Sequence, residues 1–385
     1  MLSLLSVVLL TAIFWTARMA YNAPSPQRRS VFILSTLILV TLGSSFLNPF
    51  AAQAVIGGIS TLSHQSASGS SDSSPVNQVP HRKTEHIVNE LAGSNFQKHT
   101  FITKYHNAKH LPSTLILTAT DDDQSWGRNE VEADRSFLSF LDIVTRQQIP
   151  PQDISIGLLT SDLAALMRYN TILLGKDIPV ASVEIIYAPD TEFKVGSDPT
   201  GRSFQPRNAL MGELFKEQEH VIWIDPDIFE LPEGLFQRFY RVAKSSIDRF
   251  QVPNVPKKKR AKLLPLGIVT VLCRERSYRD LARNAYTGPS EREMRKWQED
   301  QNRKPLKVWP RPMSQIVKGT SADSLVRLDG VGETVLYIRG ELVRKGLKWP
   351  IGDDSKFDGL CPLAKDMGWG CYGLGGTWET KHTDF

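Results

Sequence analysis

The sequence predicts an α/β fold with a mostly parallel sheet, placed behind an amino-terminal membrane anchor and a flexible stem. From residue 114 onward, short β-rich runs alternate with stretches of helical periodicity, and this alternation is typical of parallel sheets with helical crossovers. Two apolar runs lie before residue 60, and a polar, low-complexity stretch follows them. The 385 residues therefore divide into an anchor at 1–59, a stem at 60–110 and a globular domain at 111–385.

The anchor is predicted from hydropathy and from the position of the first positive charges. The apolar runs at 1–17 and 31–59 each approach the ~20 residues that a helix needs to cross a bilayer. Arg18, Arg28 and Arg29 lie between them with no acidic residue, so this loop should be cytosolic and the residues after 59 lumenal. This orientation holds whether both runs span the membrane or only the second does. A cleaved signal peptide fits less well, because the first run lacks a basic start.

The stem is predicted from composition. Ser, Gly, Gln, Asn and Pro dominate from Ser60 to about Pro80, and such a stretch cannot bury enough apolar surface to fold. An anchor, a stem and a globular domain together are the layout of a Golgi-type transferase, although receptors and proteases share it.

The globular domain begins with the first strongly apolar run. Strands are predicted at Thr114–Thr118, Ile154–Leu159, Val180–Tyr187, Val221–Ile224, Gly267–Leu272 and Thr334–Ile338. Helices are predicted at Arg135–Val144, Asp162–Leu174, Asn208–Gln218, Leu235–Ser245 and Phe357–Met367.

Charge and cysteine content narrow the function classes. The 46 basic residues are spread among 41 acidic ones, giving a net charge of +5, so no nucleic-acid partner is implied. Of the three cysteines, Cys361 and Cys371 are the pair expected to form a disulfide in an oxidising lumen, with two buried free thiols as the alternative. Cys273 has no obvious partner.

A basic run at 257–260, Lys-Lys-Lys-Arg, follows Pro253 and Pro256. Behind a membrane anchor it would not act as a nuclear-localisation signal. A solvated loop is the simplest interpretation; a contact with a diphosphate or an acidic membrane surface is the other.

The motif that carries chemistry is an Asp-x-Asp sequence. Asp225 and Asp227 directly follow the hydrophobic strand at 221–224, so both carboxylates can point into the cleft where open α/β sheets bind ligands. Two hard oxygen ligands suit Mn²⁺ or Mg²⁺, and a metal there could bridge the phosphates of a nucleotide-sugar. Pro226 between them is also typical of a plain solvated turn.

Ordered blocks over the globular domain resemble the fungal mannan-polymerase glycosyltransferases, glycosyltransferase family 62. They run from an opening strand, through the Asp-x-Asp region, to a closing strand followed by a histidine. The blocks are Leu115–Thr120, Arg207–Leu210, Asp225–Asp227, Val252–Val255, Leu328–Gly332, Thr334–Tyr337, Arg344–Gly346, Trp349–Pro350, Ala364–Gly368, Tyr372–Leu374 and His382.

This resemblance implies a GT-A-like, Rossmann-related fold and an α-1,6-mannosyltransferase of the Golgi lumen. GDP-mannose would be the donor, Mn²⁺ (or Mg²⁺) the cofactor and a mannose-containing glycan the acceptor. The transfer would be retaining, within a membrane-anchored hetero-oligomer of related subunits. By position, Asp225 and Asp227 would hold the metal with His382 as third ligand. A neutral imidazole in that role would lose the metal as it protonates.

The resemblance also suggests residues for the donor. Thr118, Ala119 and Thr120 would line the guanosine pocket, although they could equally belong to the core. Arg207 would contact the donor diphosphate or pair with an acidic neighbour. Asp225 would reach the donor through the metal.

On the acceptor side, Asp329 is the best carboxylate, because adjacent glycines allow close approach; a turn or N-cap role competes with this interpretation. The sequence departs from the family where an acidic Glu-x-Glu pattern is expected, and Asp358 would retain one of those two carboxylates. Pro226 is a second departure. These departures favour the rival hypothesis, a non-catalytic subunit that stabilises an active partner.

Overall fold

A computed structural model describes residues 84–91, 95–127, 135–189, 205–275, 285–289, 299, 310–332, 334–350 and 359–383. The chain divides into two units, Met1–Asn77 and Gln78–Phe385, and all described residues belong to the second. The predicted anchor at 1–59 lies outside the described residues. Among those that are described, no helix is long and apolar enough to cross a membrane.

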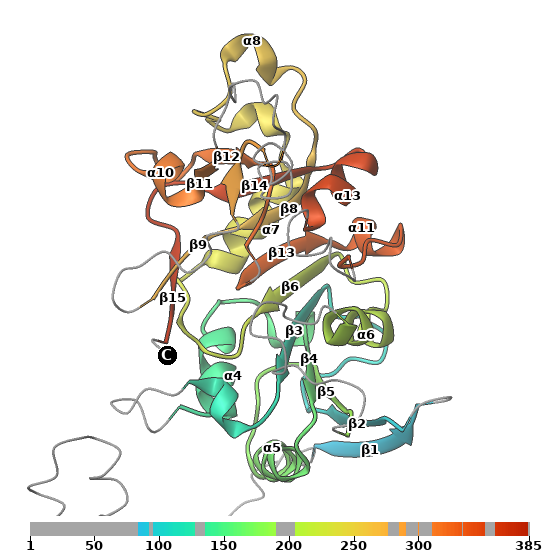
Figure 1. Ribbon diagram of the computed structural model, residues 1–385. Helices are drawn as coiled ribbons and strands as arrows, with labels where there is room; N and C mark the ends of the chain where they lie inside the picture. The colour runs from blue at the N-terminus through green and yellow to red at the C-terminus, as the bar shows by residue number, and fades with distance from the viewer. Residues whose placement is uncertain are drawn as a thin grey trace, which may run out of the picture. The chain divides into compact units, whose positions relative to one another are not determined.

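A sheet of ten strands forms the centre of the described unit, in the order β1-β2-β5-β4-β3-β6-β13-β8-β14-β12 (Figure 1). The strands are β1 (Glu85–Glu90), β2 (Gln97–Ile102), β3 (Thr114–Thr120), β4 (Ile154–Thr160), β5 (Ser182–Tyr187), β6 (His220–Ile224), β8 (Leu266–Thr270), β12 (Leu325–Leu328), β13 (Val335–Arg339) and β14 (Gly370–Leu374).

The α/β prediction is confirmed, but the sheet is mixed rather than mostly parallel. β5, β4, β3 and β6 run parallel to one another, and β8 is parallel to β14. β13 runs antiparallel to both β6 and β8, and β12 runs antiparallel to β14.

The parallel strands form the buried part of the sheet. All seven residues of β4 are buried, as expected for a strand covered on both faces. Gly157 in β4 allows close helix packing, because a Cβ there would lie 2.5 Å from a methyl carbon of Leu214 in α6. This contact fixes α6 (Gln205–Leu214) against the strands that lead to the Asp-x-Asp motif.

The helices agree closely with the sequence prediction. α4 (Phe137–Thr145), α5 (Leu163–Gly175), α6, α7 (Leu235–Lys244) and α13 (Leu360–Asp366) fall on the predicted segments, with Phe357 and Asp358 of the last segment outside the described residues. Asp162 caps α5 by accepting hydrogen bonds from the backbone of Ala164 and Ala165. Short helices were not predicted: α8 (Lys257–Arg260), α10 (Met313–Val317), α11 (Gly340–Arg344), η1 (Asp123–Trp126), η3 (Pro151–Asp153) and η4 (Ile247–Arg249).

The predicted stem ends earlier than residue 110. β1 and β2 form a hairpin, and β2 pairs antiparallel with β5 from Gln97 to Ile102. The globular domain therefore begins by residue 85. The composition at 85–102 concealed this, because β1 lies at the sheet edge with mostly exposed residues and so lacks a hydrophobic run.

Two small sheets complete the fold. β7 (Ile228–Glu230), β15 (Glu379–His382) and β9 (Leu272–Glu275) form one, with β15 in the middle. β10 (Tyr286–Thr287) and β11 (Arg311–Pro312) form the other.

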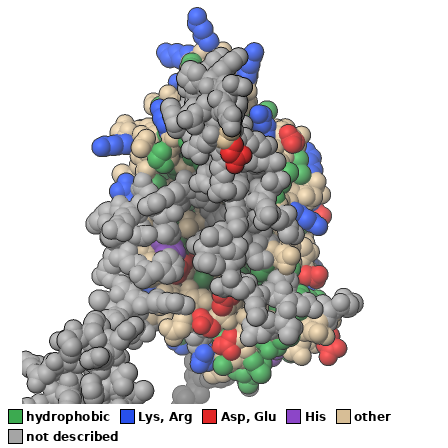
Figure 2. All heavy atoms as spheres, viewed as in Figure 1, with side chains coloured by type: hydrophobic (Ala, Val, Ile, Leu, Met, Phe, Trp, Pro, Cys, Tyr) green, Lys and Arg blue, Asp and Glu red, His purple; other side chains and the backbone are tan. Residues whose placement is uncertain are grey.

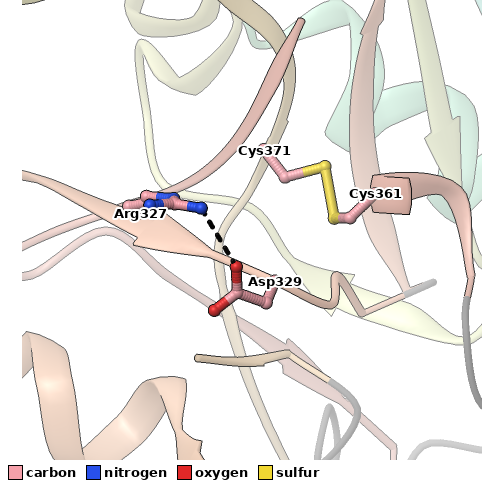
Figure 3. Close-up of a disulfide and its surroundings, with 4 residues drawn as sticks. All are labelled: Arg327, Asp329, Cys361 and Cys371. Atoms are coloured by element: carbon pink, nitrogen blue, oxygen red, sulfur yellow. Dashed lines mark hydrogen bonds and ion pairs between the residues drawn. A yellow bond between two sulfur atoms is a disulfide. The ribbon is translucent and has the colours of Figure 1, made fainter. Parts of the chain in front are cut away.

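Cys361 and Cys371 form a disulfide that joins α13 to β14 (Figure 3). Cys273 is a buried free thiol in β9. The disulfide alternative of the sequence analysis is the one that the structure adopts.

Candidate metal centre

The first part of the centre is the turn between β6 and β7. β6 ends at Ile224, and the backbone N–H of Asp225 donates to the Thr334 carbonyl at 2.8 Å. The Ile228 N–H then donates to the Asp225 carbonyl at 3.2 Å, which closes a tight turn around Pro226. Both aspartates therefore lie just beyond the carboxyl end of β6, at the sheet edge where α/β folds bind ligands.

The carboxyl-terminal strand supplies the third residue. β15 pairs with β7 so that His382 lies opposite Ile228, and the Thr383 N–H donates to the Asp227 carbonyl at 3.2 Å. This pairing places His382 Nε2 2.7 Å from Asp227 Oδ2.

Asp225, Asp227 and His382 consequently form one compact group. One possible ligand atom from each residue lies within 4.8 Å of the others. His382 is fully buried, and Asp225 and Asp227 are 6% and 9% exposed. Like charges at such a depth are costly unless a cation or a proton compensates them.

The imidazole of His382 is held in a state that suits coordination. Its Nδ1 lies 2.8 Å from the Thr383 carbonyl, and because a carbonyl only accepts, Nδ1 carries the proton. Nε2 is then directed at Asp227. A histidine that donates its other ring N–H to a backbone carbonyl is the usual arrangement of metal-binding imidazoles.

Burial alone would lower the pKa of His382, but the hydrogen bond to Asp227, the nearby carboxylate charges and the Thr383 carbonyl together raise it above its ordinary value. A proton on Nε2 or a cation in contact with both residues would satisfy this pair. The donor set of two carboxylates and one imidazole fits Mn²⁺ or Mg²⁺, and Asp225, Asp227 and His382 are the residues that could hold it.

Arg207 positions Asp225. Its Nη2 donates to Asp225 Oδ1 at 3.2 Å, and Trp223 Nε1 donates to the same oxygen at 2.9 Å. The guanidinium lies over the Trp223 ring at 4.4 Å and is buried. The contact with an acidic neighbour, one of the two roles expected of Arg207, is present in the structure, and its contact with a donor diphosphate stays a prediction.

Asn208 fixes the helix that carries Arg207. Its amide donates to the Trp349 carbonyl and accepts from the Trp349 N–H, both at 2.8 Å. Trp349 packs edge-on against Trp223, with ring centroids 5.9 Å apart. The Arg-Asn and Trp-Pro blocks of the sequence therefore meet in space behind Asp225.

The residues expected to line the nucleotide pocket lie at the correct sheet edge but mostly in the core. Thr118 and Thr120 are buried, and Thr120 Oγ1 lies 3.4 Å from both the Leu159 carbonyl and the Tyr169 hydroxyl. Ala119 is half-buried. Asp122, from the acidic triplet that follows, caps η1 by accepting the N–H groups of Gln124 and Ser125.

Asp329 is not part of this group. Three strands separate β12 from β6. Leu328 pairs with Cys371, at the end of β14 that lies far from the metal centre. Strand spacing therefore places Asp329 roughly 20 Å from Asp225. Its carboxylate accepts from Thr287 Oγ1 at 3.1 Å and from the Gly288 N–H at 2.8 Å, which is the turn role that competed with catalysis. Asp358 lies outside the described residues.

Sequence reasoning did not identify Trp223, Thr383 and Cys273 at the centre. Trp223 could have been found, because an indole two residues before Asp225 lies on the same side of the strand. Cys273 pairs with Thr380 in the small sheet, and burial raises the pKa of its thiol to about 11. Cys273 is not among the residues whose possible ligand atoms converge at the centre.

No family model matches the sequence, and no curated protein matches it. Similar solved structures include residues 1–349 of TarS from S. aureus, at 10% identity and a TM-score of 0.35. That likeness covers 70% of this chain and 60% of TarS 1–349. A second is the mannosyltransferase PcManGT from Pyrobaculum calidifontis in complex with GDP-Man and Mn²⁺, at 10% identity and a TM-score of 0.39, covering 71% of this chain and 57% of that one.

A third similar structure is CMP:2-keto-3-deoxy-manno-octonic acid synthetase complexed with CTP, at 9% identity and a TM-score of 0.32, covering 71% of this chain and 90% of that one. The chain thus spans less than two thirds of the length of TarS 1–349 and PcManGT. Likenesses at these TM-scores establish no function.

Proposed function

We propose that this chain is a metal-dependent glycosyltransferase that uses GDP-mannose with Mn²⁺ or Mg²⁺. The observation that carries the proposal is the buried group of Asp225, Asp227 and His382 at the carboxyl end of a strand in an α/β sheet. A divalent metal bound there would neutralise negative charge on the departing diphosphate.

The chain's own residues would organise that site in two ways. Arg207 and Trp223 hold Oδ1 of Asp225, so this carboxylate has one orientation before a ligand arrives. Thr383 fixes the ring of His382 and, through its N–H, the backbone of Asp227. Such preorganisation lowers the entropy that ligand binding must overcome.

The finer part of the proposal is retaining α-1,6 transfer of mannose to an α-mannoside acceptor in the Golgi lumen, within a hetero-oligomer. It is supported by the ordered sequence blocks that resemble the mannan-polymerase family. Two of these blocks, Arg207–Leu210 and Trp349–Pro350, contact each other behind the metal centre, through Asn208 and Trp349.

The rival function is a non-catalytic subunit with the same fold. One observation favours it: Asp329, the carboxylate expected to serve the acceptor, is engaged in a turn on another part of the sheet. A structural subunit would keep the fold and would not require metal-dependent donor binding.

The test is calorimetric titration of the full chain with GDP-mannose, in Mn²⁺ and in EDTA, for the wild type and for Asp227→Asn. Asp142→Asn is the matched control, because Asp142 is an exposed carboxylate paired with Arg146 on α4. Binding that requires Mn²⁺, disappears in Asp227→Asn and persists in Asp142→Asn supports the donor site. Donor binding that is absent with Mn²⁺ in the wild type would favour the structural subunit.

An activity assay with an α-mannoside acceptor then addresses the finer proposal. Incorporation of mannose, with a 1,6 linkage identified by methylation analysis, supports it. Transfer to water alone, or a different linkage, would leave a GDP-mannose-binding protein with another acceptor.

A further inference from the structure

A large cleft lies away from the metal centre, between α8, the β10–β11 pair, the end of β12 and α13. Its volume is about 1340 Å³. The residue Asp329 is on its lining, so the same strand count that separates Asp329 from Asp225 separates the two sites by roughly 20 Å. The disulfide Cys361–Cys371 and the pair Arg327–Asp329 lie side by side in its wall (Figure 3).

The lining of this cleft is strongly cationic. Among the described residues, the lining holds six basic side chains and one carboxylate, Asp329; the basic residues are Lys258, Lys259, Lys262, Arg311, Arg327 and Lys365. Arg327 pairs with Asp329 at 3.4 Å. In the part of the chain that the structure describes, the other five cations have no ion-pair partner. Figure 2 shows Lys and Arg side chains gathered at the tip of the molecule, where Figure 1 places α8.

Hydrogen bonds hold the basic helix α8 beside the cleft. Arg260 donates to the carbonyls of Val252 and Val255, at 3.2 and 3.3 Å, and so ties α8 to the preceding loop. That loop is tied to β12 by Asn254, whose amide donates to the Arg327 carbonyl at 2.8 Å and accepts from the Arg327 N–H at 3.1 Å. The lysines of α8 are exposed, and these contacts hold the segment that carries them in a fixed position beside β12.

Hydrogen bonds also hold the other side of the cleft, formed by the turn after β10 and by β14. Asp329 holds the turn after β10 through Thr287 and Gly288. The chain after α8 is held by the Tyr372 hydroxyl, which donates to the Leu264 carbonyl at 2.5 Å. Asp329, the only carboxylate among the described lining residues, thus shapes the cleft and pairs with Arg327, and it does not neutralise the lysines.

Cations that converge on one cleft repel one another, and that repulsion falls when an anion enters. Lysine ammonium groups and a guanidinium supply charge-assisted donors for phosphate oxygens, and several cations favour a multiply charged anion over a single carboxylate. The concave shape favours a ligand that enters the cleft over a flat anionic surface.

We propose that this cleft is a second ligand site, distinct from the metal centre, that binds a molecule carrying phosphate groups. The proposal does not rest on the proposed transferase function, because none of its residues belongs to the metal centre. A sugar phosphate and a glycerophosphate headgroup share the chemistry that the cleft recognises.

The test is calorimetric titration of the full chain with inorganic pyrophosphate in EDTA, at low ionic strength because salt screens exposed charges. Lys258→Ala/Lys259→Ala removes two cleft cations. Lys109→Ala/Lys176→Ala is the matched control, since both of these lysines are exposed and lie outside the cleft. We expect about a tenfold or greater loss of pyrophosphate affinity in the cleft variant, a loss for Arg311→Ala as well, and none in the control or in Asp227→Asn.

Equal affinities for the cleft variant and the control, or no binding of pyrophosphate to the wild type, would overturn the proposal. Titrations with glucose 6-phosphate and with glycerol 3-phosphate identify the source of the phosphate, since the tighter binder assigns the ligand to a saccharide or to a lipid headgroup. Glucose is the control for that comparison. If it binds as tightly as glucose 6-phosphate, the cleft does not recognise phosphate and the proposal fails.

Discussion

His382 Nε2 lies 2.7 Å from Asp227 Oδ2, and the pairing of β15 with β7 is what brings these two distant parts of the chain together. If the proposed centre binds metal, the imidazole would supply the third ligand atom of the group, and we therefore expect His382→Ala to weaken Mn²⁺ binding by about tenfold or more. Titration of the metal-free full chain with Mn²⁺, followed by electron paramagnetic resonance, measures this directly.

The control for that prediction is His110→Ala, which removes an exposed histidine that pairs with Asp153. Circular dichroism of both variants distinguishes a lost ligand from a lost fold. Unchanged Mn²⁺ affinity in a folded His382→Ala protein would show that the histidine is a structural partner of Asp227 and not a ligand.

Arg207 acts on the centre through Asp225, so its substitution should affect metal affinity and stability together. In Arg207→Lys the charge remains, but the stacking on Trp223 is weakened and the geometry of the contact with Asp225 changes. We expect a loss of about 1–2 kcal/mol in the free energy of unfolding and a several-fold weaker binding of Mn²⁺. Urea denaturation and Mn²⁺ titration measure the two effects.

The comparison for Arg207→Lys is Arg146→Lys, at an exposed residue of α4 whose partner is Asp142. Exposed pairs contribute little, so this variant should match the wild type in both measurements. If Arg207→Lys loses stability but binds Mn²⁺ as the wild type does, Arg207 supports the fold without positioning Asp225 for the metal.

The sequence predicted the centre where its signals are local, and failed where they are not. Asp225 and Asp227 follow a buried five-residue strand, so an apolar run and two acidic residues suffice to identify them. No local pattern indicates His382; the sequence suggested it only through family resemblance, because its position depends on strand pairing with a distant part of the chain. The sequence also did not show which acidic residue pairs with Arg207, because the contact with Asp225 depends on tertiary packing.

The secondary structure was likewise predicted where the sequence signal is local and missed where it depends on tertiary packing. Strongly apolar strands such as β4 were predicted within a residue or two. β14 was indicated only by the family resemblance at Tyr372–Leu374 and not by its apolar pattern, because its sequence, Gly-Cys-Tyr-Gly-Leu, has little strand propensity of its own. Tertiary packing selects it, since Gly373 leaves room for Met313, whose methyl carbon would lie 2.5 Å from a Cβ at that position.

Gly340 is predicted to be essential for the packing of β6 against its neighbour. A Cβ at residue 340 would lie 1.9 Å from the Gln218 carbonyl oxygen, just before β6 begins, and backbone cannot move aside as a side chain can. Gly340→Ala should therefore reduce the free energy of unfolding by about 3 kcal/mol or more. Gly212→Ala is the matched control, because a Cβ there meets nothing within 4 Å in α6.

Gly212→Ala should be neutral or raise the free energy of unfolding by up to about 1 kcal/mol, since alanine is the better helix former. Urea denaturation of both variants separates the steric effect at residue 340 from a general effect of glycine replacement. Equal stability of the two variants would show that α11 can shift away from Gln218 at little cost.

His220 should make stability depend on pH. It is buried, its Nδ1 lies 2.9 Å from the Tyr337 hydroxyl, and its ring stacks on Tyr240. The pKa of His220 is lowered from 6.5 to about 4, mainly by burial; Glu219 opposes this shift, and Lys244 and Arg339 contribute to it. Between these two pKa values the unfolded chain binds a proton at His220 that the folded chain does not bind. The contribution of neutral His220 to stability is therefore complete above about pH 6.5 and is lost as the pH falls towards 4.

The expected size of this loss is about 2 kcal/mol between about pH 7 and pH 5. His220→Gln retains a hydrogen-bonding group for Tyr337 but cannot take up a proton, so the stability of the variant should fall less over this range. His110→Gln, at an exposed site, should follow the wild type. Denaturant unfolding at both pH values measures how much stability each protein loses. Parallel pH profiles for wild type and His220→Gln would show that His220 protonates in the folded protein as readily as in the unfolded chain.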